Sequence, residues 1–280
     1  MAMSTLPESE TVLSSARPTV RRIAPERPWL WLADGFRDFI RAPRSSLLYG
    51  FAIALISYGL TALLGSLDRL PLLLPLLAGF ALVSPFLAVG LYGISRTLEE
   101  HGTVSLATVT ASLSDRSGQI ALMGALFMLI NIAWVRVATL LFALFFAQTP
   151  AGLSDLLDLL LRTETGFVFL AVGSVIGAVF AFGTFAISAI SIPMLLDREV
   201  GIVEALATSW TAVMANPVPM GLWAVLIVLA VLLGFATFFI ALIFVMPLVG
   251  YATWHAYRDL VSPYDPSAHS QITFLFVESN

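Results

Sequence analysis

Arg136 is the residue whose chemistry fits its surroundings least, because it stands about midway along the apolar segment 119–147. An arginine at the centre of a hydrocarbon layer costs about 2.5–3.5 kcal/mol on insertion scales. No Asp or Glu lies inside the long apolar segments. We expect Arg136 either to contact an anion or a lipid headgroup in a polar cavity, or to be hydrogen-bonded to carbonyls between helices. Its candidate neighbours are Asn131, or Asp68 or Asp155 if it reaches outward.

The remaining groups that could do chemistry are few and scattered. The chain has no cysteine and three histidines: His101, His255 and His269. His101 follows two glutamates at a polar helix end, which is typical of solvated charge, and His255 is expected to be an interfacial residue beside Tyr257. No Ser-His-Asp set, phosphate-binding loop or pair of intramembrane carboxylates is present. The sequence therefore predicts a protein that is not an enzyme and that has no cofactor or metal site.

Two prolines are expected to bend their helices. Pro85 and Pro247 each lie in an apolar segment, and each removes the N–H that would bond the carbonyl four residues earlier. Bent helices that line a cavity occur in transporters, but kinks are common in membrane bundles without transport. The lack of carboxylates inside the apolar segments weighs against coupling of transport to protons or cations.

The elements that must position these residues are membrane helices. The chain of 280 residues is 59% hydrophobic and only 11% charged, whereas soluble domains are about a quarter charged. The mean hydropathy is +0.93. A bilayer core needs about 20 apolar residues for each helical crossing, and lipid leaves the edge strands of an open sheet unsatisfied. Five apolar blocks meet this requirement: 45–67, 70–93, 119–147, 167–196 and 220–257.

The last block is too long for one crossing, so we divide it into 220–238 and 240–259, with a break near Phe239. The predicted fold is thus an all-α, polytopic membrane helix bundle of about six transmembrane helices, arranged as three hairpin repeats with cytoplasmic amphipathic helices. An apolar face recurs ahead of the first and third hairpins at spacings of three and four residues. These faces comprise Trp29, Leu32, Phe36 and Phe39, and Val203, Leu206, Trp210 and Val213.

Basic residues predict the orientation, because short cytoplasmic segments are enriched in arginine. All fourteen basic residues are arginine. Six crossings with the N-terminus inside leave Arg69 and Arg162 on the opposite side and Arg136 within a span. The cytoplasmic arginines are Arg17, Arg21, Arg22, Arg27, Arg37, Arg41, Arg44, Arg96, Arg116, Arg198 and Arg258. This distribution predicts that both chain ends are cytoplasmic.

Composition divides the chain into three parts. Residues 1–28 are polar and are expected to form a disordered cytoplasmic N-terminal arm. Residues 29–261 form the six-span membrane domain, and 262–280 a loose cytoplasmic C-terminal tail. The amphipathic stretches ahead of the hairpins would either lie in the headgroup region or pack on the bundle.

Several segments resemble the bacterial inner-membrane family catalogued as domain of unknown function 2189. These segments are 46–50 (SLLYG), 84–96 (SPFLAVGLYGISR), 134–136 (WVR) and 252–261 (ATWHAYRDLV). The resemblance runs from about residue 29 to residue 261, and it implies a polytopic inner-membrane protein without an assigned activity. Some members carry the label cytochrome c oxidase subunit I, but such a subunit needs about six histidine ligands, more than this chain contains.

The functional hypothesis that fits best is a non-enzymatic scaffold or lipid-interacting accessory protein of the bacterial inner membrane. Its expected partners are the lipid bilayer and anionic lipid headgroups, and the net charge of −4 gives no reason to expect nucleic acid. A small-molecule transporter or permease component is the alternative. A respiratory-chain-associated subunit is the second alternative. No protein partner follows from the sequence.

Overall fold

The structure, a computed structural model, describes residues 19–67, 69, 72–104, 116–146 and 153–261. Within these ranges the chain is helical and has no strands, which confirms the all-α class and the membrane helix bundle. The only strand-like pairing there is a single bridge between Val20 and Val261. Residues 1–18, the tail 262–280 and residues 105–115, which belong to the stretch ahead of the second predicted hairpin, lie outside the described residues.

Eleven helices are described. Their bounds are α1 Arg27–Arg41, α2 Pro43–Ser66, α3 Leu73–Leu87, α4 Val89–His101, α6 Ser117–Phe145, α7 Leu153–Arg162, α8 Glu164–Ser188, α9 Ser191–Asp197, α10 Ile202–Ala215, α11 Pro217–Ala236 and α12 Leu242–Leu260.

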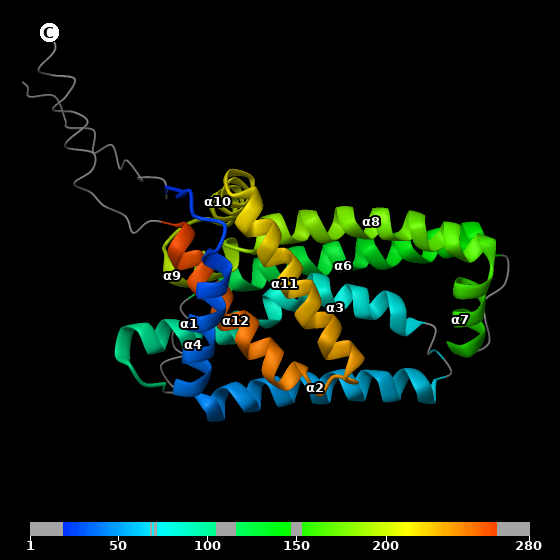
Figure 1. Cartoon of the computed structure of the whole chain (residues 1–280), viewed down its shortest axis with the longest axis horizontal. Helices are drawn as coiled ribbons and strands as arrows, with labels where there is room; N and C mark the ends of the chain where they lie inside the picture. Colours follow the sequence, from blue (N-terminus) through cyan, green and yellow to red (C-terminus); the bar gives the residue numbers. More distant parts are fainter. Residues whose placement is uncertain (1–18, 68, 70–71, 105–115, 147–152, 262–280) are drawn as a thin grey trace, which may run out of the picture.

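The longest helices run along one direction, with short helices at both ends (Figure 1). α2, α3, α6 and α8 lie roughly along the long axis of the molecule, whereas α1 runs across it. α1, α9 and α10 gather at one end, which we call the arginine end, and α7 lies at the other, the α7 end. Helices α1 and α10 therefore stand where the sequence placed its amphipathic stretches ahead of the first and third hairpins.

Five stretches of the described chain are long and apolar enough to cross a membrane. They are Pro43–Ser66, Pro75–His101, Ser117–Phe145, Glu164–Asp197 and Pro217–Ala236. The second joins α3 to α4, and the fourth joins α8 to α9. The sixth expected span corresponds to α12, which is a helix but is not one of these five. Six crossings therefore stay a prediction, and the path of α12 is taken up below.

The first and last described residues lie together at the arginine end. The Arg21 N–H donates to the Leu260 carbonyl at 2.8 Å, next to the bridge between Val20 and Val261. The Asn216 side chain bonds the backbone on both sides of Arg22, accepting from Ile23 N–H and donating to the Arg21 carbonyl, each at 2.9 Å. Residues 19–26, which the sequence assigns to the arm, are thus bonded to the bundle.

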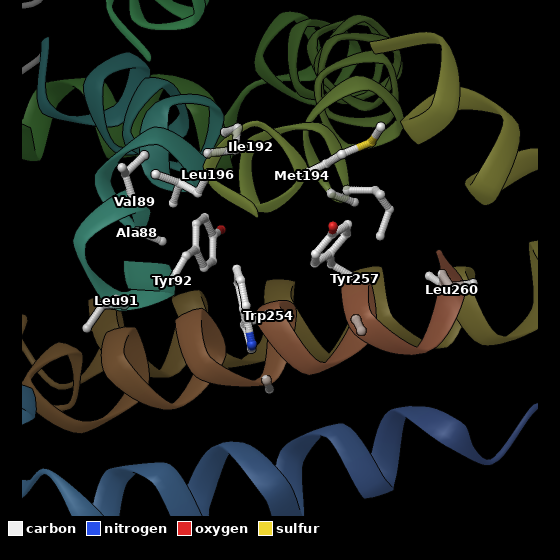
Figure 2. Packing of buried hydrophobic residues seen from close by; sticks show 14 of the residues in the cluster. Ala88, Val89, Leu91, Tyr92, Ile192, Met194, Leu196, Trp254, Tyr257 and Leu260 are labelled. Atoms are coloured by element: carbon white, nitrogen blue, oxygen red, sulfur yellow. The ribbon is translucent and has the colours of Figure 1, made fainter. Parts of the chain in front are cut away.

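The main hydrophobic core also lies at the arginine end, where α12 packs against α1, α4 and α9. Its largest fully buried side chains include Trp31, Trp254, Tyr92 and Tyr257. Figure 2 shows Tyr92 and Tyr257 reaching into the space between α12 and the segments α4 and α9. By contrast, α6 and α8 bury few of their residues inside the chain. Most of their surface is therefore available to lipid.

Each predicted kink proline has a local consequence. Pro85 leaves the Ala81 carbonyl without its helical N–H, and the Ser84 hydroxyl donates to that carbonyl at 3.0 Å. α3 ends two residues after Pro85, and α4 begins at Val89. α12 continues through Pro247 without interruption, although Pro247 leaves the Ile243 carbonyl without its N–H.

Gly50 of α2 lies directly against that carbonyl. A Cβ atom added to Gly50 would stand 2.0 Å from the Ile243 oxygen, far inside any allowed contact. α2 and α12 share one of the larger contact areas in the molecule, so this close approach sets how the first hairpin packs on α12. Gly59, on the same helix, has nothing within 4 Å of the corresponding position.

These two glycines give a matched test of the packing. We expect Gly50→Ala to destabilise the protein by about 1–3 kcal/mol, because the methyl group must push α2 away from α12. Gly59→Ala should be neutral or stabilising by up to about 1 kcal/mol through its better helix propensity. Thermal unfolding of the detergent-solubilised chain and its abundance in membranes measure both effects. Equal behaviour of the two variants would contradict the observed α2–α12 contact.

Candidate functional site

The last two turns of α12 form the richest polar cluster in the described chain. Trp254, His255, Tyr257, Arg258 and Asp259, which we call the α12 hub, bond to partners on α1, α4 and α9 and to the residue that follows α9. Most of these partners are more than 150 residues away along the chain. The hub therefore ties together segments that only the folded bundle brings close.

Asp259 holds the start of α1. Its carboxylate accepts two hydrogen bonds from the Arg27 guanidinium, at 2.6 and 2.7 Å, and one from the Trp31 indole N–H at 2.9 Å. The hydrogen bond to Asp259 raises the pKa of Arg27 above its ordinary value, so the Arg27 guanidinium stays charged at any physiological pH. A bidentate pair of this kind fixes orientation as well as distance. The Trp31 ring is in turn packed edge-on against Trp223.

Asp38, in the second half of α1, is buried with only 4% of its surface exposed. Its Oδ2 atom accepts a hydrogen bond from the Ser95 hydroxyl at 2.8 Å and lies 2.8 Å from His255 Nε2. In a nucleophilic triad the histidine stands between the acid and the serine. Here the carboxylate stands between the other two, so His255 cannot activate Ser95 and the group acts as a structural clamp.

Glu99 of α4 and Asp197 of α9 are the remaining acidic partners of the hub. Glu99 accepts from the Trp254 indole N–H at 3.0 Å and pairs with Arg258 at 2.8 Å. Asp197 accepts from the Tyr257 hydroxyl at 2.5 Å, and its Oδ2 lies 3.3 Å from Arg258. Arg198 donates to the same Tyr257 oxygen at 2.8 Å. Tyr257 thus links an acid and a base from the end of α9.

The chemistry available to the hub is structural. Each carboxylate of the hub and of its partners accepts hydrogen bonds from arginine, histidine, tryptophan, serine or tyrosine. In the part of the chain that the structure describes, no three His, Cys, Asp or Glu residues are placed to hold a metal ion. These groups are already engaged with one another and not arranged around a space for a substrate.

Sequence reasoning found the hub's segments but not its pairs. It treated Glu99 as solvated charge at a polar helix end and His255 as an interfacial neighbour of Tyr257. Glu99 is exposed and pairs with Arg258, and His255 lies 2.8 Å from Asp38. Asp38 occurs among charged residues in α1, a pattern typical of a solvent-facing surface, yet it is buried. The signal that could have found it is its spacing of three residues from the helix's only glycine, Gly35, which lies against Ala252.

Arg136 and Asn131 do not come together in a site. Asn131 is half-buried, and its side-chain amide donates to the Gly79 carbonyl at 2.9 Å, which joins α6 to α3. Arg136 is exposed on the other side of α6, and no described residue forms a hydrogen bond or ion pair with it. Asn131 therefore serves the contact between helices, and Arg136 faces the surroundings of the bundle.

A cavity of about 550 Å³ lies towards the α7 end, between α3, α6, α7 and α8. Its lining includes Trp134 and Leu141 of α6 and Gly173 and Gly177 of α8, which carry no side chains into the space. Among the described residues that line it, Arg69 alone is charged, and Arg136 is not part of the lining. The size falls in the range of small-molecule sites, and the lining suits a hydrocarbon chain rather than a polar molecule.

Comparison with known proteins agrees with this architecture. Residues 73–197 match the family described as predicted integral membrane protein (DUF2189). The match confirms the resemblance read from the sequence over α3 to α9, and it carries no activity with it. Neither the curated proteins nor the solved structures gave a match to this chain.

The Asp38 clamp can be tested against an exposed acid on the same helix. We expect Asp38→Ala to destabilise the protein by about 3 kcal/mol, because His255 and Ser95 lose a buried charged acceptor. Asp34→Ala should change stability by less than about 1 kcal/mol, since Asp34 pairs only with exposed Arg37. Thermal unfolding in detergent measures both, and equal shifts would show that the clamp does not hold α1.

Proposed function

We propose that this protein is a non-enzymatic, lipid-interacting component of a bacterial inner membrane, with both chain ends in the cytoplasm. Its arginine end lies in the cytoplasmic headgroup region, where anionic lipids attract basic residues. The orientation rests on the arginine distribution across short loops. The integral membrane character is shared with the family that residues 73–197 match.

The observation that carries this proposal is the outer face of α1. Trp29, Ala33, Phe36 and Ile40 are all exposed and recur at intervals of four, three and four residues, which places them on one helical face. Arg37 and Arg41 lie beside this face and are also exposed. Because the opposite side is anchored to α12 through Trp31, Gly35 and Asp38, α1 holds an amphipathic, basic surface across the end of the bundle (Figure 1).

α10 repeats the apolar part of this face without its charge. Val203, Ala207, Trp210 and Met214 are exposed at the same spacing. In each helix the last of the four stands three residues before the proline that begins the next helix, Pro43 in one case and Pro217 in the other. α10 contains no basic residue. We therefore assign contact with anionic headgroups to α1, and contact with the apolar part of the interface to both helices.

The two other functions have less support. A transporter of polar molecules needs a polar route through the bundle, whereas the large described cavity is apolar and excludes Arg136. A respiratory subunit with haem needs histidine ligands, whereas His255 is bonded to Asp38 and His101 is exposed beside Glu100.

The headgroup contact predicts a specific loss of anionic lipid. The full-length protein, purified gently in a nanodisc or mild detergent, should retain anionic lipids detectable by mass spectrometry. The double variant Arg37→Gln, Arg41→Gln should weaken that retention by about 1 kcal/mol for each residue. Arg162→Gln, at the α7 end, is the matched control and should leave it unchanged. Equal retention by all three proteins would refute the headgroup contact of α1.

The cavity between α3, α6, α7 and α8 provides a second contact with lipid. We propose that one acyl chain of an anionic phospholipid occupies it, with its headgroup at Arg69, which is exposed at the edge of the lining. Gly177 faces Trp134 across the cavity, at 3.4 Å from its missing Cβ position, whereas Gly183 of the same helix faces open space. A larger side chain at Gly177 would therefore fill the cavity, and one at Gly183 would not.

The two glycines test the cavity. Gly177→Leu should abolish retention of the lipid that survives detergent washing, and Gly183→Leu should preserve it. Arg69→Gln should shift the retained species from anionic to neutral lipids. Native mass spectrometry of the full chain measures all three. Retention of the same lipid by Gly177→Leu would show that the cavity is not its site, whatever the result for α1.

A further inference from the structure

The turn between α11 and α12 has the composition of a membrane interior. It consists of Thr237, Phe238, Phe239, Ile240 and Ala241, without a charged residue. Phe238 is 76% exposed and Ile240 is 57% exposed. The two connections at the α7 end differ, because they contain charged residues such as Arg69 and, on α7, Asp158 and Arg162. A turn that reached water at that end would expose large apolar side chains to it.

The turn also stops short of the α7 end. The Phe239 ring packs edge-on against Tyr58 of α2, with 5.5 Å between ring centroids. Tyr58 precedes the end of α2 at Ser66 by about 12 Å of helical rise. Phe235 likewise meets Phe80 of α3, about 10 Å from the start of that helix. Figure 1 shows α11 running obliquely and the turn lying part-way along α2.

The N–H groups of the turn are all bonded within the chain. The N–H groups of 237, 238, 239 and 240 donate to the carbonyls of Leu233, Phe235, Gly234 and Thr237, at 2.8–3.2 Å. The Thr237 hydroxyl accepts from the Ala241 N–H at 3.0 Å and donates to the Leu233 carbonyl at 2.8 Å. An N–H without a partner costs several kcal/mol in lipid, so this internal bonding lets the turn remain there.

The chain accepts backbone strain to make this turn. Phe238 and Phe239 have φ values of 51° and 68°, in the left-handed region that bulky residues rarely adopt. Phe239 is held there by its contacts with Tyr58 and Phe235, and only 8% of it is exposed. Phe238 has no such ring contact, and its side chain is exposed on the outside of the turn.

We propose that the α11–α12 hairpin is re-entrant. It enters the hydrocarbon from the arginine end and turns back at Phe238 and Phe239, and Phe238 and Ile240 contact the acyl chains of the far leaflet. The apolar part of α12, from Leu242 to Trp254, is only about 20 Å long, shorter than the about 30 Å of a bilayer core. Four passes then cross fully: α2, α3 with α4, α6, and α8 with α9. Val20 and Val261, near the two ends of the described chain, then remain on one side, as the bridge between them requires.

Single cysteines test this path directly, because the chain contains none of its own. Phe238→Cys and Ile240→Cys are exposed replacements at the turn, and Asp158→Cys on α7 and Asp34→Cys on α1 are controls for the two surfaces. In intact cells and in opened membranes, a membrane-impermeant maleimide should label Asp158→Cys from one side and Asp34→Cys from the other. Both turn variants should resist it from both sides.

A depth measurement gives the positive signal. A fluorophore attached at 238 in liposomes should be quenched more strongly by lipids brominated deep in the acyl chain than by quenchers in the headgroup. Labelling of Phe238→Cys and Ile240→Cys from the Asp158 side, with headgroup quenching at 238, would show that the hairpin crosses completely and would overturn the proposal. Labelling from the Asp34 side would place the turn in water at the arginine end and would overturn it equally.

Discussion

Hydrocarbon offers no hydrogen-bond partner, so the backbone N–H and C=O groups that this chain places in it must be bonded by the chain itself. The helices meet most of that demand, and hydroxyl side chains meet part of the rest. The Ser57 and Thr139 hydroxyls donate hydrogen bonds to backbone carbonyls one turn earlier. The Ser84 hydroxyl donates to the carbonyl that Pro85 leaves without its N–H. The Thr237 hydroxyl accepts a hydrogen bond within the turn between α11 and α12. The same demand limits where the chain can be irregular.

Strong polar interactions are consequently concentrated at the arginine end. There α12 contributes five consecutive or nearly consecutive side chains, from Trp254 to Asp259, and each bonds to another segment. Hydrogen bonds between charged groups are stronger than neutral ones and demand fixed geometry. They orient α1, whose outer face can then meet the lipid surface. The α12 hub therefore links the packing of the bundle to the surface proposed to bind lipid.

The sequence was sufficient for the class of fold and for most helices, because long apolar runs and arginine bias follow directly from the properties of a bilayer. Pro43 and Pro217 likewise mark helix starts from local chemistry alone. The pairing of Asp38 with His255 was out of reach, since the two are 217 residues apart and neither is unusual locally. Arg136 could be singled out as a charge inside an apolar segment. The side of α6 on which it lies depends on how α6 packs and could not be predicted. The length of the last apolar block suggested two crossings, but how deep its turn lies depends on the contacts of Phe239 with α2.

The central claim is that the long helices lie in a bilayer with the arginine end and the α7 end on opposite sides. Paired reporter fusions, one inserted at Asp158 and one after the last residue, measure this directly. The account predicts that a reporter active only outside the cytoplasm functions at Asp158 and fails at the C-terminus, while a cytoplasmic reporter shows the reverse. Both reporters active in the same compartment would contradict it.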